Sequence, residues 1–73
     1  MAQLQDGKEY RGEGKWVRLQ AILDGGTATL SCRTANAPAA SEVETMSEGF
    51  VDVHTPLLGF YSVALTGSAK VYS

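Results

Sequence analysis

Apolar residues alternate with polar ones in several short runs of this 73-residue chain, and clusters of Gly, Pro, Asn and Asp separate the runs. Alternation with a period of two is the pattern of a β-strand that buries one face, whereas a helix repeats its apolar residues every three or four positions. The chain is therefore expected to be all-β, with about five strands in a small antiparallel β-sandwich or a partly open β-barrel.

The clearest alternation lies in residues 15 to 35. The segment KWVRLQAIL (15 to 23) is followed by DGG (24 to 26), which tolerates the positive φ angles of a tight turn, and then by TATLSCRTA (27 to 35). These residues predict a β-hairpin with one core face. The residues expected on that face are Val17, Leu19, Ala21, Leu23, Ala28, Leu30 and Cys32.

A second hairpin is predicted at the end of the sequence, where FYSVALT (60 to 66) and AKVYS (69 to 73) flank Gly67 and Ser68. A further strand, FVDVH (50 to 54), precedes it. A chain that finishes in a strand is expected to have a structured terminus. That last strand is either paired inside the sheet or left as an edge for another chain.

The whole chain, residues 1 to 73, is expected to form a single β domain, since its length supports only one core. Residues 1 to 14 are expected to form an extended arm or an edge strand, with Tyr10 between glycines. Residues 36 to 49 contain Pro38 and three alanines, and predict a loop with a single helical turn or a short irregular edge strand.

The net charge argues against a protein whose main task is to neutralise phosphates. The sequence has six basic and eight acidic residues, which gives a net charge of -2. Residues 1 to 35 carry a net +1 and residues 36 to 73 a net -3, a polarity that would help subunits to meet. No stretch of about 20 apolar residues would span a membrane, and the first ten residues lack the apolar run of a secretory signal. Synthesis in a cytoplasm is therefore expected.

Residues that could carry chemistry are few. Cys32 is the only cysteine and His54 the only histidine, so no disulfide and no Cys/His metal site is expected. Cys32 lies on the predicted core face, where a free cysteine acts as a small apolar group. His54 shares a strand face with Asp52, but no motif supplies a nucleophile. No catalytic, metal or cofactor site is predicted, and the protein is expected not to be an enzyme.

The remaining functional candidate is a set of aromatic and basic residues on predicted outward positions. The types Trp, Tyr, Phe and Arg are enriched at the centres of protein interfaces, and they can also stack on bases or sugars. The negative net charge favours a protein partner, while a module that binds single-stranded nucleic acid or glycan is the alternative. The predicted interface residues are Tyr10, Arg11, Trp16, Arg18, Phe60 and Tyr72.

The C-terminal segment GFYSVALTGSAKVY (59 to 72) resembles the closing hairpin of small all-β virion proteins of tailed bacteriophages. The preceding EGFVDVHTPLLGFY (48 to 61) is similar to the strand and connection that lead into that hairpin. The resemblance covers about a third of the chain. It implies a non-enzymatic structural protein of the virion, a capsid decoration or cement protein or a neck or tail accessory, whose partners are other virion proteins and copies of itself.

Overall fold

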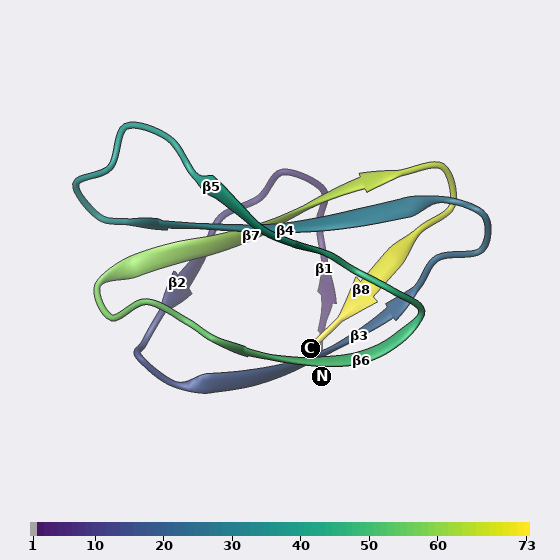
Figure 1. The fold of residues 1–73 in the computed structure, drawn as a ribbon, viewed down its shortest axis with the longest axis horizontal. Helices are drawn as coiled ribbons and strands as arrows, with labels where there is room; N and C mark the ends of the chain where they lie inside the picture. Colours follow the sequence, from purple (N-terminus) through teal and green to yellow (C-terminus); the bar gives the residue numbers. More distant parts are fainter. Residues whose placement is uncertain (1) are drawn as a thin grey trace.

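The computed structural model describes residues 2–73, which form eight β-strands and no helix. The strands are β1 (Gln3–Leu4), β2 (Tyr10–Gly12), β3 (Trp16–Ile22), β4 (Thr27–Thr34), β5 (Ser41–Thr45), β6 (Gly49–His54), β7 (Gly59–Thr66) and β8 (Lys70–Tyr72). They make two four-stranded sheets, in the orders β1-β8-β3-β6 and β2-β7-β4-β5, and these sheets pack as two layers (Figure 1). The predicted all-β sandwich is confirmed, with eight strands in place of about five.

Alternation predicted the inward faces correctly. Leu19, Leu30, Val63 and Val71 are almost fully buried between the two sheets, together with Leu4 from β1. Each of these side chains comes from a different strand, so the core joins both layers. Burial of aliphatic side chains at roughly 1.5–3 kcal/mol each is the main stabilising contribution in a domain of this size.

Both predicted hairpins are wrong. Strand β3 pairs with β6 and β8, whereas β4 pairs with β5 and β7, so the connection at residues 24 to 26 carries the chain from one sheet to the other. The turn residues behave as expected, since Asp24 and Gly25 have φ angles of 46° and 83°. Strands β7 and β8 likewise belong to different sheets. The two strands of each predicted hairpin therefore face each other across the core, which buries their apolar faces without pairing their edges.

Three strands, β1, β2 and β5, lie outside the five that alternation predicts, and all three are short edge strands. β1 and β2 have two and three residues, too few to show an alternating pattern. The short strand expected around Tyr10 is confirmed as β2. Residues 36 to 49 contain β5, whose five residues are all exposed, so the edge-strand alternative is confirmed and the helical turn is not formed.

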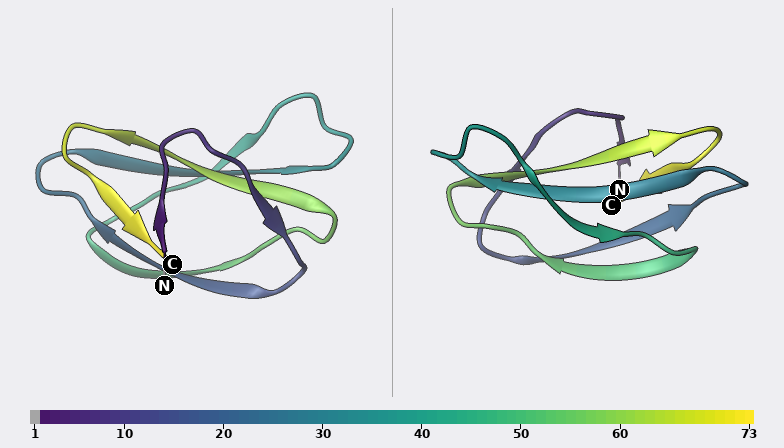
Figure 2. Two further views of the ribbon diagram at one scale, coloured as in Figure 1. Left: turned by 180° about the vertical axis from the view of Figure 1, so that it is seen from behind. Right: turned by 45° about the horizontal axis from the view of Figure 1, so that its top comes forward.

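The N-terminal segment closes one side of the sandwich. It runs from β1 in one sheet to β2 in the other, as the view from behind shows (Figure 2). Between these strands, Gly7 N donates to Val63 O (2.9 Å) and Leu65 N donates to Asp6 Oδ1 (2.8 Å). The arm expected at residues 1 to 14 thus pairs with its own molecule over its described part. The last strand, β8, is paired on both sides, by β1 and β3.

The opposite side of the sandwich is formed by the edge strands β5 and β6 and faces the viewer in Figure 1. Residues 46 to 48 connect these strands from one layer to the other. No helix among residues 2–73 is long and apolar enough to cross a membrane.

Candidate interaction face

The outer face of the β1-β8-β3-β6 sheet is built in three cross-strand rows. The antiparallel register places Trp16 beside His54, Arg18 beside Asp52, and Gln20 between Phe50 and Tyr72. Because side chains alternate along each strand, every residue of these rows points away from the core. The rows therefore form one surface, which we call the outer aromatic face.

Two large apolar side chains of this face are open to solvent. Trp16 and Phe50 are each 70% exposed, and Ile22 is 41% exposed at the far end of β3. The Trp16 ring meets the His54 ring edge to face, with centroids 5.2 Å apart. This contact packs the indole against the neighbouring strand and leaves most of its surface open to solvent.

Arg18 and Asp52 form a two-pronged ion pair between the aromatic rows. Arg18 Nε donates to Asp52 Oδ1 (2.8 Å) and Arg18 Nη2 donates to Asp52 Oδ2 (3.2 Å). The hydrogen bond from Arg18 lowers the pKa of the Asp52 carboxyl below its usual value. Both groups stay charged near neutral pH and cancel each other, so the guanidinium of Arg18 is already occupied by a protein carboxylate.

The six predicted interface residues do not lie on one face. Trp16, Arg18 and Tyr72 belong to the outer aromatic face, and Tyr72 is half-buried there. Arg11 and Phe60 are paired on the outer face of the other sheet. The sequence pattern assigns these residues to outward positions, but it does not show to which of the two sheets each one belongs.

Tyr10 points inward. Its ring stacks on Tyr61 with centroids 5.7 Å apart, and its hydroxyl accepts a hydrogen bond from Gln5 N (2.8 Å). Tyr10 packs against the hydrophobic core and fastens the N-terminal segment. Its place is structural, because Tyr10 lies directly opposite Tyr61 in the pairing of β2 with β7, and directly opposite residues point to the same face of a sheet, here the core face.

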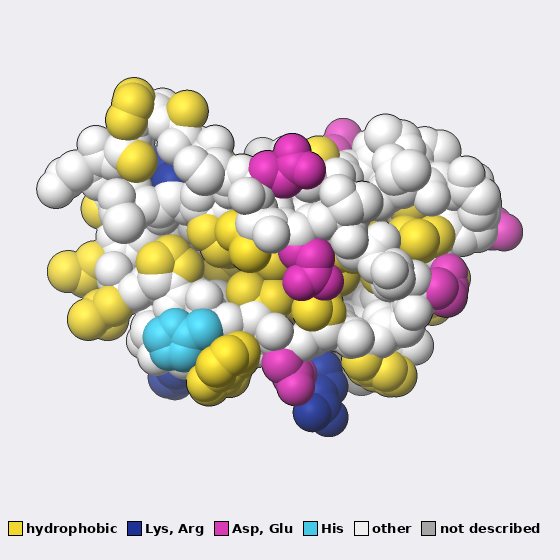
Figure 3. Space-filling model, in the orientation of Figure 1, with side chains coloured by type: hydrophobic (Ala, Val, Ile, Leu, Met, Phe, Trp, Pro, Cys, Tyr) yellow, Lys and Arg dark blue, Asp and Glu magenta, His cyan; other side chains and the backbone are white. Residues whose placement is uncertain are grey.

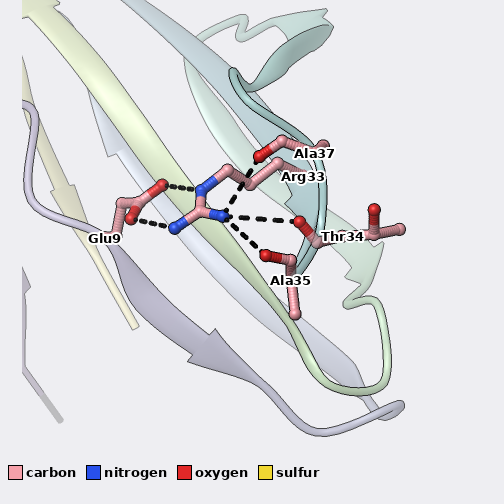
Figure 4. Close-up of polar contacts among 5 residues, drawn as sticks. All are labelled: Glu9, Arg33, Thr34, Ala35 and Ala37. Atoms are coloured by element: carbon pink, nitrogen blue, oxygen red, sulfur yellow. Dashed lines mark hydrogen bonds and ion pairs between the residues drawn. The ribbon is translucent and has the colours of Figure 1, made fainter.

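Phe60 is covered by Arg33, whose guanidinium carbon lies 4.4 Å from the ring centroid. Figure 4 shows that this guanidinium also donates to Glu9 from the N-terminal segment, at 2.5 and 2.8 Å, and contacts the carbonyl oxygens of residues 34, 35 and 37. Arg33 thus ties the N-terminal segment to the turn after β4. Arg33 is not among the predicted interface residues, because a single Arg at an outward position near the end of a core strand is a weak signal.

The surroundings of Cys32 and His54, the two side chains considered above for reactivity, do not activate either of them for catalysis. Cys32 is half-buried on the inward side of β4, and burial raises the pKa of its thiol, which disfavours the nucleophilic thiolate. Asp52 pairs with Arg18, and His54 contacts Trp16. No group of three or more possible metal ligands occurs among the described residues.

Three exposed residues of the outer aromatic face were missed, namely Phe50, His54 and Ile22. Their outward positions could be read from the alternation, but their proximity to Trp16 and Arg18 follows from the pairing of β3 with β6. Residues 30 to 38 positions apart in the chain meet only through that pairing. Comparison of the chain with known protein families, with curated proteins and with solved structures found no match.

Proposed function

We propose that this protein is a non-enzymatic structural protein of a tailed-phage virion, a capsid decoration or cement protein or another head or tail accessory. It would be made in the host cytoplasm and would act in the virion through contacts with other virion proteins and with copies of itself. The virion assignment rests on the resemblance of residues 48 to 72. The observation that carries the mode of action is the exposure of Trp16 and Phe50 on one face of a β-sheet.

The outer aromatic face has the composition of a protein interface centre. Exposed aromatic residues flank an ion pair that is already neutralised internally, so a partner surface need not supply a matching charge. Trp is among the residues that dominate binding energy when a partner buries them. A small domain with a single cysteine has no internal disulfide, and it would also gain stability from such a neighbour.

The test is binding to phage shells prepared without this protein, measured by co-sedimentation. Trp16→Ala and Phe50→Ala are each expected to weaken binding roughly thirtyfold, since truncation of a central aromatic residue costs about 2 kcal/mol. Leu57→Ala is the matched control, because Leu57 is equally exposed but lies in the loop before β7. Equal binding of all four proteins would refute the proposal.

A glycan is the second candidate ligand for the same face. The exposed Trp16 ring lies next to the Arg18–Asp52 pair, and a flat aromatic surface beside paired donors and acceptors suits a sugar ring. Single-stranded nucleic acid is less favoured, because Arg18 is held by Asp52. Titration with oligosaccharides and oligonucleotides would be followed by the fluorescence of Trp16, the only tryptophan. A saturable change would support this candidate over the virion role.

A further inference from the structure

The outer edge of β6 carries unpaired backbone groups. Among residues 2–73, β6 has β3 as its only neighbour in the sheet. Thr55 N donates to Lys15 O (2.8 Å) just beyond the end of β6, and hydrogen-bonded positions alternate along an antiparallel pair. Since Thr55 is bonded to β3, Val53 and Val51 are bonded to it as well. The N–H and C=O groups of the residues between them, Phe50, Asp52 and His54, therefore point away from β3.

The other edge on this side, β5, is a poor acceptor for a new strand. The ladder between β4 and β5 changes register between Leu30 and Ser31, which bends the edge. β6 keeps an unbroken register with β3 over all six of its residues. Its inward side chains include Val51 and Val53, so it also lacks the inward charge that often protects an edge strand.

An apolar hollow lies beside this edge. It has a volume of about 390 Å³ and opens between the end of β4, the turn after it, β5 and the end of β6. Its walls include Cys32, Ala37, Val43 and Pro56, and Val43 is 55% exposed. Figure 3 shows hydrophobic side chains in the gap between the layers on this side. A strand added to β6 would place every second side chain over this gap, with the hollow at the end of β6 beside His54.

The charges along the gap between the two layers on this side are acidic. Figure 3 shows acidic side chains there, and the acidic residues of this region are Glu42, Glu44, Glu48 and Asp52. Of these four, only Asp52 has a basic partner among the described residues, and residues 34 to 69 contain no Lys or Arg. Arg33 lines the hollow itself, and its charge is paired with that of Glu9. A second copy paired edge to edge through β6 would bring two such acidic sets together, which like-charge repulsion disfavours. A basic partner fits the same gap.

From this edge, hollow and charge we infer that β6 binds an extended, basic segment of a partner protein, which adds to the sheet as a fifth strand next to β6. Its apolar side chains, at every second position, cover the gap between the layers and the hollow at its end, and the Lys or Arg side chains between them carry the positive charge that this acidic side of the molecule attracts. Main-chain hydrogen bonds supply affinity in such strand addition, and the alternate side chains supply selectivity. The inference uses the edge of the sheet and is independent of the function proposed for the outer aromatic face.

The first test uses a labelled peptide, Lys-Val-Lys-Val-Lys-Val-Lys with blocked ends, followed by fluorescence anisotropy. The controls are the same peptide with its central Val replaced by Pro, and an acidic version with Glu in place of Lys. Amide hydrogen exchange by NMR then locates the peptide. We expect protection to rise at the amides of Phe50, Asp52 and His54, while Val51 and Val53 are protected already in the free protein.

Protein variants separate the two contributions. Asp52→Pro and Asp52→Ala both remove the carboxylate, but only Asp52→Pro also removes the outward N–H. The Asp52→Pro variant should therefore bind the basic peptide roughly tenfold more weakly than the Asp52→Ala variant. A proline whose N–H would face solvent is tolerated at an edge strand, and unchanged thermal unfolding would verify the fold. The Glu42→Gln, Glu44→Gln double variant should weaken binding about fivefold, with the loss shrinking in high salt.

Three results would overturn the inference. The first is peptide binding without new protection at the three outward amides. The second is equal binding of the acidic and basic peptides. The third is protection of those amides in the peptide-free protein together with a dimer mass in light scattering, which would make a second copy the occupant.

Discussion

Replacing Thr55 with valine should destabilise the fold through two backbone amides. Thr55 is 1% exposed and is the only buried polar residue among those described. Its hydroxyl accepts hydrogen bonds from Glu13 N and Lys15 N, at 3.3 Å each, and donates to Lys15 O (3.0 Å). Valine fills nearly the same space but accepts nothing, so both N–H groups lose their partner in a site with little access to water.

The cost can be estimated from these two donors. An unsatisfied buried donor costs about 1–3 kcal/mol, and the lower end applies here because the contacts are long and only partly buried. Thr55→Val should therefore lower the free energy of unfolding by about 2 kcal/mol. For a domain of this length, that corresponds to a fall in Tm of roughly 8–16 °C.

The assay combines thermal unfolding with amide hydrogen exchange. Thr55→Ser is the matched control, since it keeps the hydroxyl and loses one methyl group, at about 1 kcal/mol. Exchange at the amides of Glu13 and Lys15 should accelerate in the valine variant and stay slow in the serine variant. If the valine variant is as stable as the natural sequence, the hydroxyl does not hold this loop and the reasoning is refuted.

Three further predictions concern other parts of the sandwich. Gly26→Ala should lower the free energy of unfolding in chemical denaturation by about 3 kcal/mol, because a Cβ there would lie 2.1 Å from Thr66 O. Gly7→Ala, whose Cβ would meet no atom within 4 Å, should lower it by about 1 kcal/mol. Equal losses for the two variants would contradict this. Cys32 should react with a thiol reagent much more slowly in the folded protein than in urea, since burial raises its pKa. The hydrogen bond from Arg33 lowers the pKa of Glu9 below its usual 4.5, so its contribution to stability is present above that value and is lost as pH falls through the folded-state pKa. Glu9→Gln should flatten the acid side of the stability profile, and an unchanged profile would argue against the pair.

The sequence predicted the fold class and the inward faces because both depend on local alternation. Leu19, Leu30, Val63 and Val71 can be assigned to a core from their positions between polar neighbours alone. Strand pairing could not be read in this way. The glycines of the turn at residues 24 to 26 suit a hairpin and a connection between layers equally well. Local sequence therefore does not distinguish the two.

The candidate site was predicted only in part for the same reason. Trp16 and Arg18 were recognised as outward aromatic and basic residues, yet their partners Asp52 and His54 lie far along the chain. Tyr10 was assigned outward because a three-residue strand has no readable alternation, and its register with Tyr61 turned it inward. Arg33 acquires its role from contacts with Glu9 and Phe60, both distant in sequence.

The sequence by itself determined that the chain is all-β, which side chains of its longer strands turn inward, and where the chain bends. Only the tertiary structure decided which strands are neighbours, that β8 is enclosed by β1 and β3, and that β6 keeps a free edge. The physical reason is that alternation and turn propensity act within a few residues, whereas pairing is chosen by the joint burial of several strands in one core. In this sandwich that choice also brought the exposed aromatic residues together and left the acidic side open.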